Sequence, residues 1–187
     1  MNPPFLNRSQ LKVFRLLFAI LLFIGVAGFS AATRSEPLGA AWVQATPANV
    51  PDLLFTDAAG EDFHRLSEHK GHWVLLNLWA TWCAPCVKEM ASLDALQADK
   101  NGQDLEIMTL AMDREGTVTV PAFFRRHTLK HLAVWLDPSS EAQRRLHADG
   151  LPTTLLLNPQ GQEVARVTGA VEWMQPENRA FIKQMMK

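Results

Sequence analysis

The stretch NLWATWCAPC, Asn77–Cys86, contains both cysteines of this 187-residue chain. It overlaps a nearly continuous apolar run, Trp73–Trp79, which is typical of a central β-strand covered on both faces. After Pro85 the apolar residues recur about every three positions, which predicts a helix. The cysteine pair therefore stands where a buried strand passes into a helix. It could be half of a metal site, a structural staple or a pair that exchanges disulfides.

The metal and staple alternatives have little support. A structural zinc site needs about four ligands, usually a second cysteine pair or histidines at a recognised distance from the first pair. Four histidines have ligand-like spacings from one another but not from the cysteines, and solvated side chains are the simpler interpretation: His69, His72, His127 and His131. Haem attachment would need a histidine where Val87 stands. A disulfide across two residues closes a loop too short to restrict the unfolded chain much.

Disulfide exchange has a physical rationale at this position. Cys83 is expected at the N terminus of the helix, where the helix dipole and free backbone N–H groups favour a thiolate and hold the pKa of the thiol below the ordinary ~8.5. We expect Cys83 to be the exposed nucleophile. Cys86, one turn further on, can then resolve the mixed disulfide. Pro85 suits the first helical turn, where its missing N–H is not needed.

The remaining pattern predicts an α/β domain with a mixed sheet. The expected strands and helices alternate after an N-terminal hairpin at Leu53–Leu66, and a second hairpin and a helix close the chain. Further strands are expected at Leu105–Met112, Leu132–Asp137, "TLLLN" (154–158) and "EVARVTG" (163–169), and helices at Val118–Thr128, Ser139–His147 and Gln175–Met186. Four aromatic residues are expected to pack in the core: Trp79, Phe123, Phe124 and Trp173. For Trp173, the alternative is that it lines a surface for a partner.

The N-terminal segment has the layout of an export signal. Arg8, Lys12 and Arg15 precede the uncharged run Leu16–Phe29, and small residues follow. This length suits either a cleaved signal peptide or a short membrane anchor, which we assign to residues 1–32. Residues 33–49, rich in Ala and Pro, are expected to form a tether, and residues 50–187 the domain. Because the basic flank stays in the cytoplasm, both alternatives place the domain outside it.

Composition narrows the function only slightly. The apolar content of 48% is that of a globular protein with a real core. The formal net charge of −1 gives no basic excess that would indicate a nucleic-acid partner.

The segments WATWCAPC (79–86) and GLPTT (150–154) resemble the thioredoxin superfamily. More narrowly, GHWVLLNLWATWCAPCVKEM (71–90) is similar to the TlpA/ResA/CcmG type of membrane-tethered or periplasmic thiol-disulfide oxidoreductases. The likeness extends over roughly residues 50–187. It implies a thioredoxin-like fold, a central mixed β-sheet flanked by helices, with the N-terminal hairpin and an inserted strand–helix unit at Thr117–Asp137.

The resemblance also implies roles for individual residues. Cys83 and Cys86 fall on the redox pair of the family. Pro152, after Leu151, falls on its cis-proline, which faces the disulfide, and the backbone of Leu151 would pair with an extended substrate. Trp82 is expected to shield Cys83 or to contact the substrate.

Glu89 falls on an acidic residue of this subgroup, three positions after Cys86 and therefore on the same helix face. A carboxylate there could take the proton of Cys86 if partial burial raises its pKa toward neutrality; the alternative is an ordinary solvated helix glutamate. Asn77 stands where thioredoxin has a buried aspartate, and an amide cannot act as a base. Ala91 replaces a proline that usually follows "EM" in this subgroup, which concerns helix geometry more than chemistry.

The implied function is a thiol-disulfide oxidoreductase of the cell envelope, most simply a protein disulfide reductase, for example in cytochrome c maturation. No diffusible cofactor and no metal are expected, because the two sulfurs carry the electrons. The implied partners are cysteine-containing envelope proteins, a membrane thiol carrier as electron donor, and the membrane through the N-terminal segment. A disulfide-forming oxidant of the same fold, or a copper or zinc metallochaperone using the two thiolates, is the alternative. A peroxidase lacks support, because the expected proline and threonine pattern before the cysteine is absent.

Overall fold

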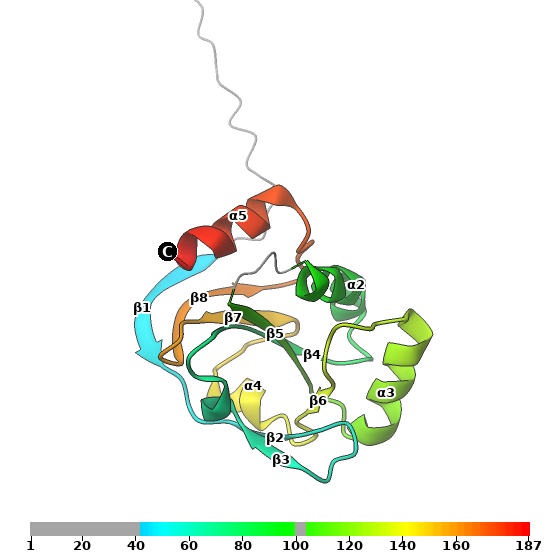
Figure 1. The fold of residues 1–187 in the computed structure, drawn as a ribbon. Coiled ribbons are helices and arrows are strands. Elements are labelled where there is room, and N and C mark those ends of the chain that lie inside the picture. The colour runs from blue at the N-terminus through cyan, green and yellow to red at the C-terminus, as the bar shows by residue number, and fades with distance from the viewer. Residues whose placement is uncertain (1–41, 100–103) are drawn as a thin grey trace, which may run out of the picture. The chain divides into compact units, whose positions relative to one another are not determined.

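A computed structural model describes residues 42–99 and 104–187 (Figure 1). Its core is an eight-stranded sheet in the order β1-β8-β7-β4-β5-β6-β2-β3. The strands are β1 Val43–Asn49, β2 Leu54–Thr56, β3 Phe63–Arg65, β4 Trp73–Trp79, β5 Leu105–Ala111, β6 Trp135–Leu136, β7 Thr153–Leu157 and β8 Gln162–Thr168. The helices are η1 Leu66–His69, α2 Ala84–Ala98, α3 Gly116–His127, α4 Glu141–Arg145 and α5 Pro176–Met185. Since β4–β5 and β5–β6 pair in parallel and the other neighbours antiparallel, the predicted mixed sheet is confirmed.

Strand β4 lies in the middle of the sheet, between β5 and β7. Leu75, Leu76 and Leu78 are fully buried, as the apolar run predicts for a strand covered on both faces. The chain leaves the carboxyl end of β4 at Trp79 and enters α2 five residues later. The cysteine pair is therefore attached to the buried central strand of the sheet.

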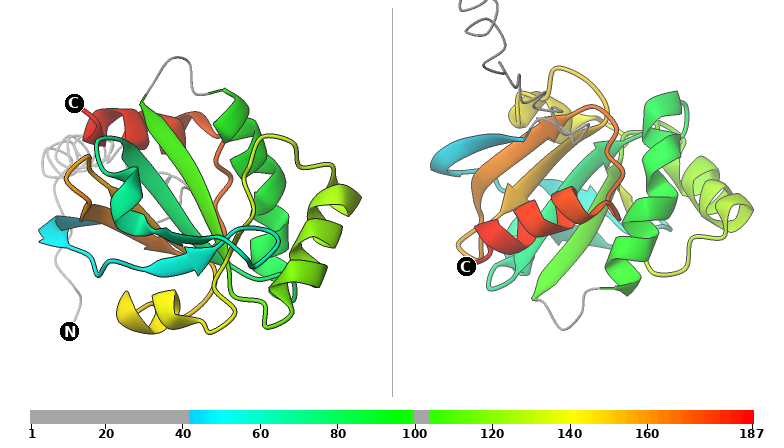
Figure 2. Two further views of the ribbon diagram at one scale, coloured as in Figure 1. Left: turned by 60° about the horizontal axis from the view of Figure 1, so that its bottom comes forward. Right: turned by 90° about the horizontal axis from the view of Figure 1, so that it is seen from above.

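Helices α2 and α5 cover one face of the sheet, and α4 lies on the opposite face (Figures 1 and 2). The segment that follows α3 is tied to α2 by Asp94, whose Oδ1 accepts the backbone N–H groups of Lys130, His131 and Leu132 at 3.0, 2.8 and 3.1 Å. Phe123 of α3 packs against Trp79, with ring centroids 5.1 Å apart. The predicted inserted unit is therefore present as α3 and β6, packed beside the active-site helix.

The predicted tether is wrong for residues 43–49. These seven residues form β1, which pairs antiparallel with β8, so the predicted domain start at Val50 is too late. Every residue of β1 is exposed, which is why the sequence shows no alternation of apolar and polar positions. Pro47 is compatible with an edge strand, and the register shifts between Gln44 and Ala48.

Three other expectations need correction. Helix α3 begins at Gly116, two residues earlier than predicted, which leaves Pro121 inside the helix. The third predicted strand is reduced to the two residues of β6. The helix predicted at Ser139–His147 is shortened to the five residues of α4, and Asp137 caps it, because its Oδ2 accepts the N–H of Ala142 at 2.7 Å. The predicted hairpins, β2–β3 and β7–β8, are confirmed.

The apolar run Leu16–Phe29 and the rest of the predicted signal or anchor lie outside the described residues. Within residues 42–99 and 104–187, no helix has the length and apolarity needed to cross a membrane.

Candidate active site

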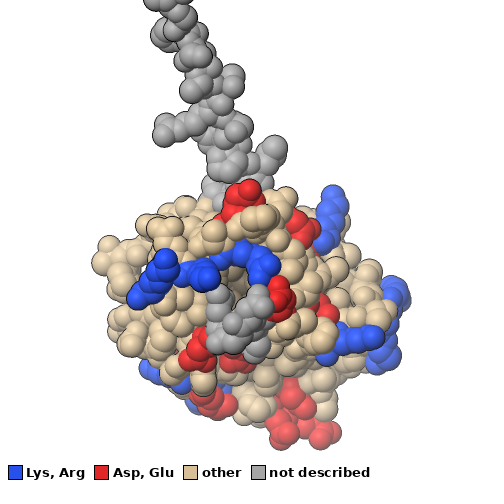
Figure 3. Space-filling model, turned by 45° about the horizontal axis from the view of Figure 1, so that its top comes forward, with Lys and Arg blue, Asp and Glu red and all other residues tan. Residues whose placement is uncertain are grey.

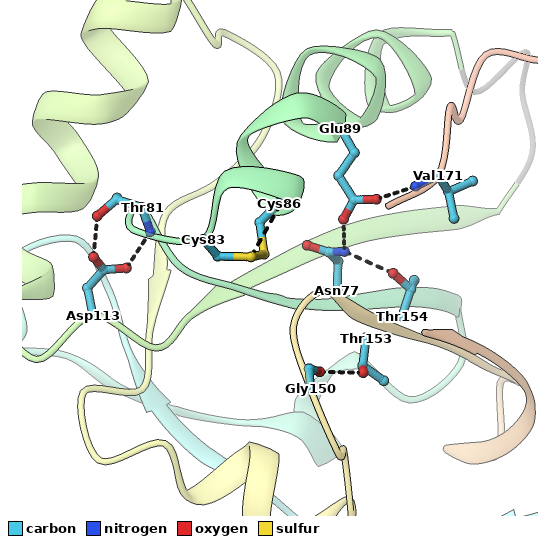
Figure 4. The surroundings of a disulfide bond; sticks show 10 residues. All are labelled: Asn77, Thr81, Cys83, Cys86, Glu89, Asp113, Gly150, Thr153, Thr154 and Val171. Carbon is cyan, nitrogen blue, oxygen red and sulfur yellow. Dashed lines mark hydrogen bonds between the residues drawn. A yellow bond between two sulfur atoms is a disulfide. The ribbon is translucent and has the colours of Figure 1, made fainter. Parts of the chain in front are cut away.

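Cys83 and Cys86 form a disulfide at the start of α2, with their Cα atoms 5.2 Å apart (Figure 4). Cys83 is the N-cap residue of the helix: its Sγ accepts the backbone N–H of Cys86 at 3.3 Å, and its carbonyl accepts the N–H of Val87 at 3.0 Å. Pro85 stands in the first turn, as predicted. The sulfur of Cys83 thus lies at the positive end of the helix dipole, where a thiolate is stabilised once the disulfide is reduced.

The two cysteines differ in their exposed surface. Cys83 is 6% exposed and Cys86 is 0% exposed. The expectation of an exposed Cys83 is therefore too strong for the oxidised form, although Cys83 is the one cysteine that reaches the surface. Trp82, the preceding residue, is 70% exposed, so a large apolar side chain stands in solvent next to Cys83 in the sequence.

A buried carboxylate braces the segment that leads to Cys83. Asp113, which follows β5, accepts the backbone N–H of Thr81 at 3.0 Å and also the Thr81 hydroxyl. Thr119 of α3 donates its hydroxyl to the same carboxylate at 3.4 Å. Asp113 thus fixes the approach to the cysteines from the neighbouring strand. The sequence analysis did not identify it.

Glu89 is buried, with 1% of its surface exposed, so the alternative of a solvated helix glutamate is wrong. Three N–H groups converge on its carboxylate. Asn77 Nδ2 donates to Oε1 at 2.7 Å, and the Val171 backbone N–H and the Trp173 indole Nε1–H donate to Oε2 at 2.8 and 3.2 Å. Cys86 and Glu89 stand three residues apart among the buried positions of α2, and both side chains are directed toward the sheet (Figure 4).

Burial raises the pKa of Glu89 from 4.5 to about 7. The cause is desolvation, which disfavours the charged carboxylate. The N–H groups of Val171, Asn77 and Trp173 act in the opposite direction, because they stabilise the anion. The balance leaves a carboxyl group that gains and loses its proton near neutral pH, as a proton acceptor for a thiol requires.

Asn77 links this carboxylate to the next strand. Its Nδ2 also donates to Thr154 Oγ1 at 2.9 Å, whereas its Oδ1 is buried and has no hydrogen-bond partner among the described residues. Asn77 and Thr154 are paired across β4 and β7. An amide cannot act as a base, and Asn77 instead joins Glu89 to Thr154 through its two N–H groups.

The Leu151–Pro152 peptide bond is cis, as the resemblance implies. Thr153, the next residue, is the first residue of β7 and pairs with Leu78 of β4. The cis-proline loop therefore enters the sheet next to the end of β4 from which the cysteine segment starts. Pro152 is buried and Leu151 half-buried. The substrate-binding roles of Trp82, Leu151 and Pro152 stay predictions.

The contacts of the histidines with ligand-like spacing do not include the disulfide. His69 is not solvated as expected: it pairs with Glu106 at 2.8 Å and packs edge-on against Trp135. His72 pairs with Asp104, and His127 stacks on Phe123. In the part of the chain that the structure describes, no three or more His, Cys, Asp or Glu side chains are grouped as a metal site would need.

Sequence reasoning placed Cys83, Cys86 and Glu89 in one site and compared Asn77 with a buried aspartate of thioredoxin. In the structure Asn77 of β4 donates a hydrogen bond to Glu89, which lies on the helix that begins at the disulfide. Sequence reasoning did not identify the two donors that complete the carboxylate site, Val171 and Trp173. Val171 acts through its backbone N–H, which leaves no signature in the sequence. Trp173 was expected in the core; it is indeed fully buried, but it also donates a hydrogen bond.

Comparisons with known proteins agree with this geometry. The family model described as "AhpC/TSA family" matches residues 47–182. The chain is 32% identical over 127 residues to "Thiol-disulfide oxidoreductase ResA" of Geobacillus kaustophilus, covering 68% of this chain and 71% of the relative. For the Bacillus subtilis protein of the same name the identity is 32% over 124 residues, covering 66% and 68%.

A solved structure of a DsbF homologue from Corynebacterium diphtheriae has the same fold, with a TM-score of 0.62, 19% identity, and coverage of 80% of this chain and 96% of that one. The family match covers most of the chain, and both curated relatives are covered over more than two thirds of their length. With a cysteine pair at disulfide distance on a thioredoxin-like sheet, the chain belongs to the AhpC/TSA family and is a thiol-disulfide oxidoreductase of the ResA type.

Proposed function

We propose that this oxidoreductase is a protein disulfide reductase in which Glu89 is the proton acceptor for Cys86. The observation that carries the proposal is the buried Glu89 carboxyl group, one helical turn after Cys86, with a pKa of about 7. A base at this position serves the step in which Cys86 attacks, and that step completes the reduction of a substrate disulfide.

The reaction balances as follows. The Cys83 thiolate attacks one sulfur of the substrate disulfide, and a substrate thiolate leaves. Glu89 takes the proton of Cys86, and the Cys86 sulfur attacks Cys83 in the mixed disulfide. The second substrate thiolate is released and the Cys83–Cys86 disulfide forms. The substrate gains two electrons, which the enzyme dithiol loses, and the proton on Glu89 passes to solvent or to a product thiolate.

We propose cysteine-containing proteins of the cell envelope as partners, apocytochrome c before haem attachment among them, and a membrane thiol carrier that reduces the enzyme again. Basic and acidic side chains share the face shown in Figure 3, so that face offers no uniform charge to a partner. The exposed Trp82 beside Cys83 favours recognition of an apolar segment that flanks the substrate cysteine.

The direction of transfer can be tested with the reduced enzyme and a peptide that carries one Cys-X-X-Cys-His disulfide. We expect the enzyme to transfer two electrons rapidly to the peptide, and we expect no transfer by the Cys83→Ser variant. The reaction is followed by alkylating the free thiols and measuring the products by mass spectrometry. If the oxidised enzyme instead converts the dithiol peptide to its disulfide to near completion, the protein is an oxidant and the proposed direction is wrong.

We further propose that the domain works on the periplasmic side of the inner membrane. The three basic residues before Leu16 support this orientation. Alkaline phosphatase fused after Lys187 is expected to be active in cells, and a reporter that works only in the cytoplasm is expected to be silent there. The opposite pattern would refute both the localisation and the envelope partners.

A further inference from the structure

The segment between β8 and α5 is fastened to the active-site helix at Glu89 and Ser92. The Trp173 backbone N–H donates to Ser92 Oγ at 3.2 Å, and Ser92 Oγ donates to the Glu89 carbonyl at 2.9 Å. The Trp173 indole Nε1–H donates to Glu89 Oε2 at 3.2 Å, on the same oxygen that accepts the Val171 N–H. Trp173 therefore binds α2 through its backbone and through its side chain.

We propose that Trp173 is a positioning residue for disulfide exchange: its indole N–H holds the Glu89 carboxylate, in its ionised form, one helical turn from Cys86. The inference rests on the proposed role of Glu89. It assigns a reaction-linked role to a side chain that neither the cysteine motif nor its immediate flanks contain.

The indole is held in this orientation by its packing. Trp173 is 0% exposed. Trp42 packs against it in an edge-to-face arrangement, with ring centroids 5.8 Å apart and planes at 74°, and Trp42 is itself stacked on Phe181 of α5 at 4.7 Å. Because a close-packed interior leaves little room for a large ring to rotate, the N–H is already aimed at Glu89 before any substrate binds.

Each group that donates a hydrogen bond to the Glu89 carboxylate is electrically neutral. Asn77 comes from β4, and Val171 and Trp173 come from the segment after β8. On α2 itself, Cys86 is the titratable group one turn away. Desolvation raises the pKa of Glu89, and neutral hydrogen-bond donors, not a cation, lower it again. The loss of one donor should therefore raise the pH at which the carboxylate forms.

The test compares Trp173→Phe with Trp79→Phe. Both tryptophans are fully buried, but the Trp79 indole nitrogen has no hydrogen-bond partner among the described residues, so its removal controls for the change in ring size. The titration of Glu89 is followed in the full-length oxidised protein by NMR of its ¹³C-labelled carboxyl group. Trp173→Phe is expected to move the midpoint up by about one pH unit, since a hydrogen bond to a charged group is lost, while Trp79→Phe leaves it in place.

The exchange rate at pH 7 should fall roughly fivefold in Trp173→Phe and recover at higher pH, because a smaller fraction of Glu89 is ionised at neutrality. Replacing Trp173 with benzothienylalanine, which keeps the ring shape and has sulfur in place of N–H, should give the same shift without a packing defect. An unchanged Glu89 midpoint in both Trp173 variants would overturn the inference. A shifted midpoint together with an unaltered pH–rate profile in Glu89→Gln would instead contradict the proposed role of Glu89.

Discussion

Replacing Cys83 with serine is expected to lower the rate of disulfide exchange by at least about 1,000-fold. Serine has no thiolate to attack a disulfide, and the buried Cys86 has no exposed surface with which to take over that role. Cys86→Ser should stop the reaction later, after Cys83 has attacked, so that mixed disulfides accumulate. Turnover with a disulfide peptide and non-reducing gels distinguish the two outcomes.

The reduced wild-type protein provides the complementary measurement. Cys83 should be alkylated faster than Cys86 near neutral pH, because its sulfur lies at the N terminus of α2 and because Cys83, unlike Cys86, keeps some exposed surface. Equal alkylation rates for the two thiols would remove the assignment of Cys83 as the attacking residue.

Glu89→Gln is expected to slow the resolution step by about 100-fold above pH 7, the lower end of what a general base contributes. In the wild-type protein the rate should rise with pH through about 7, as the Glu89 carboxylate forms, and then level off. The glutamine variant should lack this rise, because an amide does not accept a proton from Cys86. Single-turnover rates of mixed-disulfide resolution between pH 5 and 9 test this.

The glutamine should fit the site. Its side-chain oxygen can accept the N–H groups of Val171 and Trp173, as the carboxylate does. The NH₂ group of the glutamine would face the Asn77 NH₂ group, which is also a donor. If the Asn77 amide rotates by half a turn, its unpartnered Oδ1 takes that position and accepts the glutamine N–H. In the same position Oδ1 also accepts the Thr154 hydroxyl. The same rotation accommodates protonated Glu89. A loss of activity therefore reports on proton transfer and not on misfolding.

Stability gives a second measurement on the same variant. The pKa of Glu89 is raised in the folded protein to about 7 from 4.5, so between these pH values the folded state holds a proton that the unfolded state has lost. The stability that the folded protein gains by holding this proton is fully present below pH 4.5, and it is lost as the pH rises to about 7. The unfolding free energy of wild type relative to Glu89→Gln should therefore fall by about 3 kcal/mol over that window.

Asp94→Asn is the matched control, since it neutralises another buried carboxylate of α2 that bonds to the segment after α3 and not to the disulfide site. This variant should keep the rise in rate near pH 7. A pH–rate profile that is the same in wild type and Glu89→Gln would contradict the role of Glu89 as proton acceptor.

Much of this site could be predicted because its parts lie close together in the sequence. The apolar run of β4 and the period of α2 place the cysteines at a strand-to-helix junction. The three-residue spacing places Glu89 on the helix face of Cys86, and it is buried there as that position requires. Local periodicity carries this information, so one sequence is sufficient for it.

The rest depends on contacts between distant segments. Val171 and Trp173 meet Glu89 across 82 and 84 residues, and Asp113 meets Thr81 across 32. No local pattern indicates that these segments come together. Strand β1 was missed for another reason: both of its faces are exposed, so only its hydrogen bonds to β8 make it a strand.

The central claim is that Cys83 forms the bond with the substrate and Cys86 breaks it. Its most direct test is tandem mass spectrometry of the adduct formed when reduced Cys86→Ser is mixed with a disulfide peptide. We expect one peptide cysteine linked to Cys83, and no such adduct after the same treatment of Cys83→Ser. An adduct that forms on Cys86 in Cys83→Ser, with none on Cys83 in Cys86→Ser, would contradict the account.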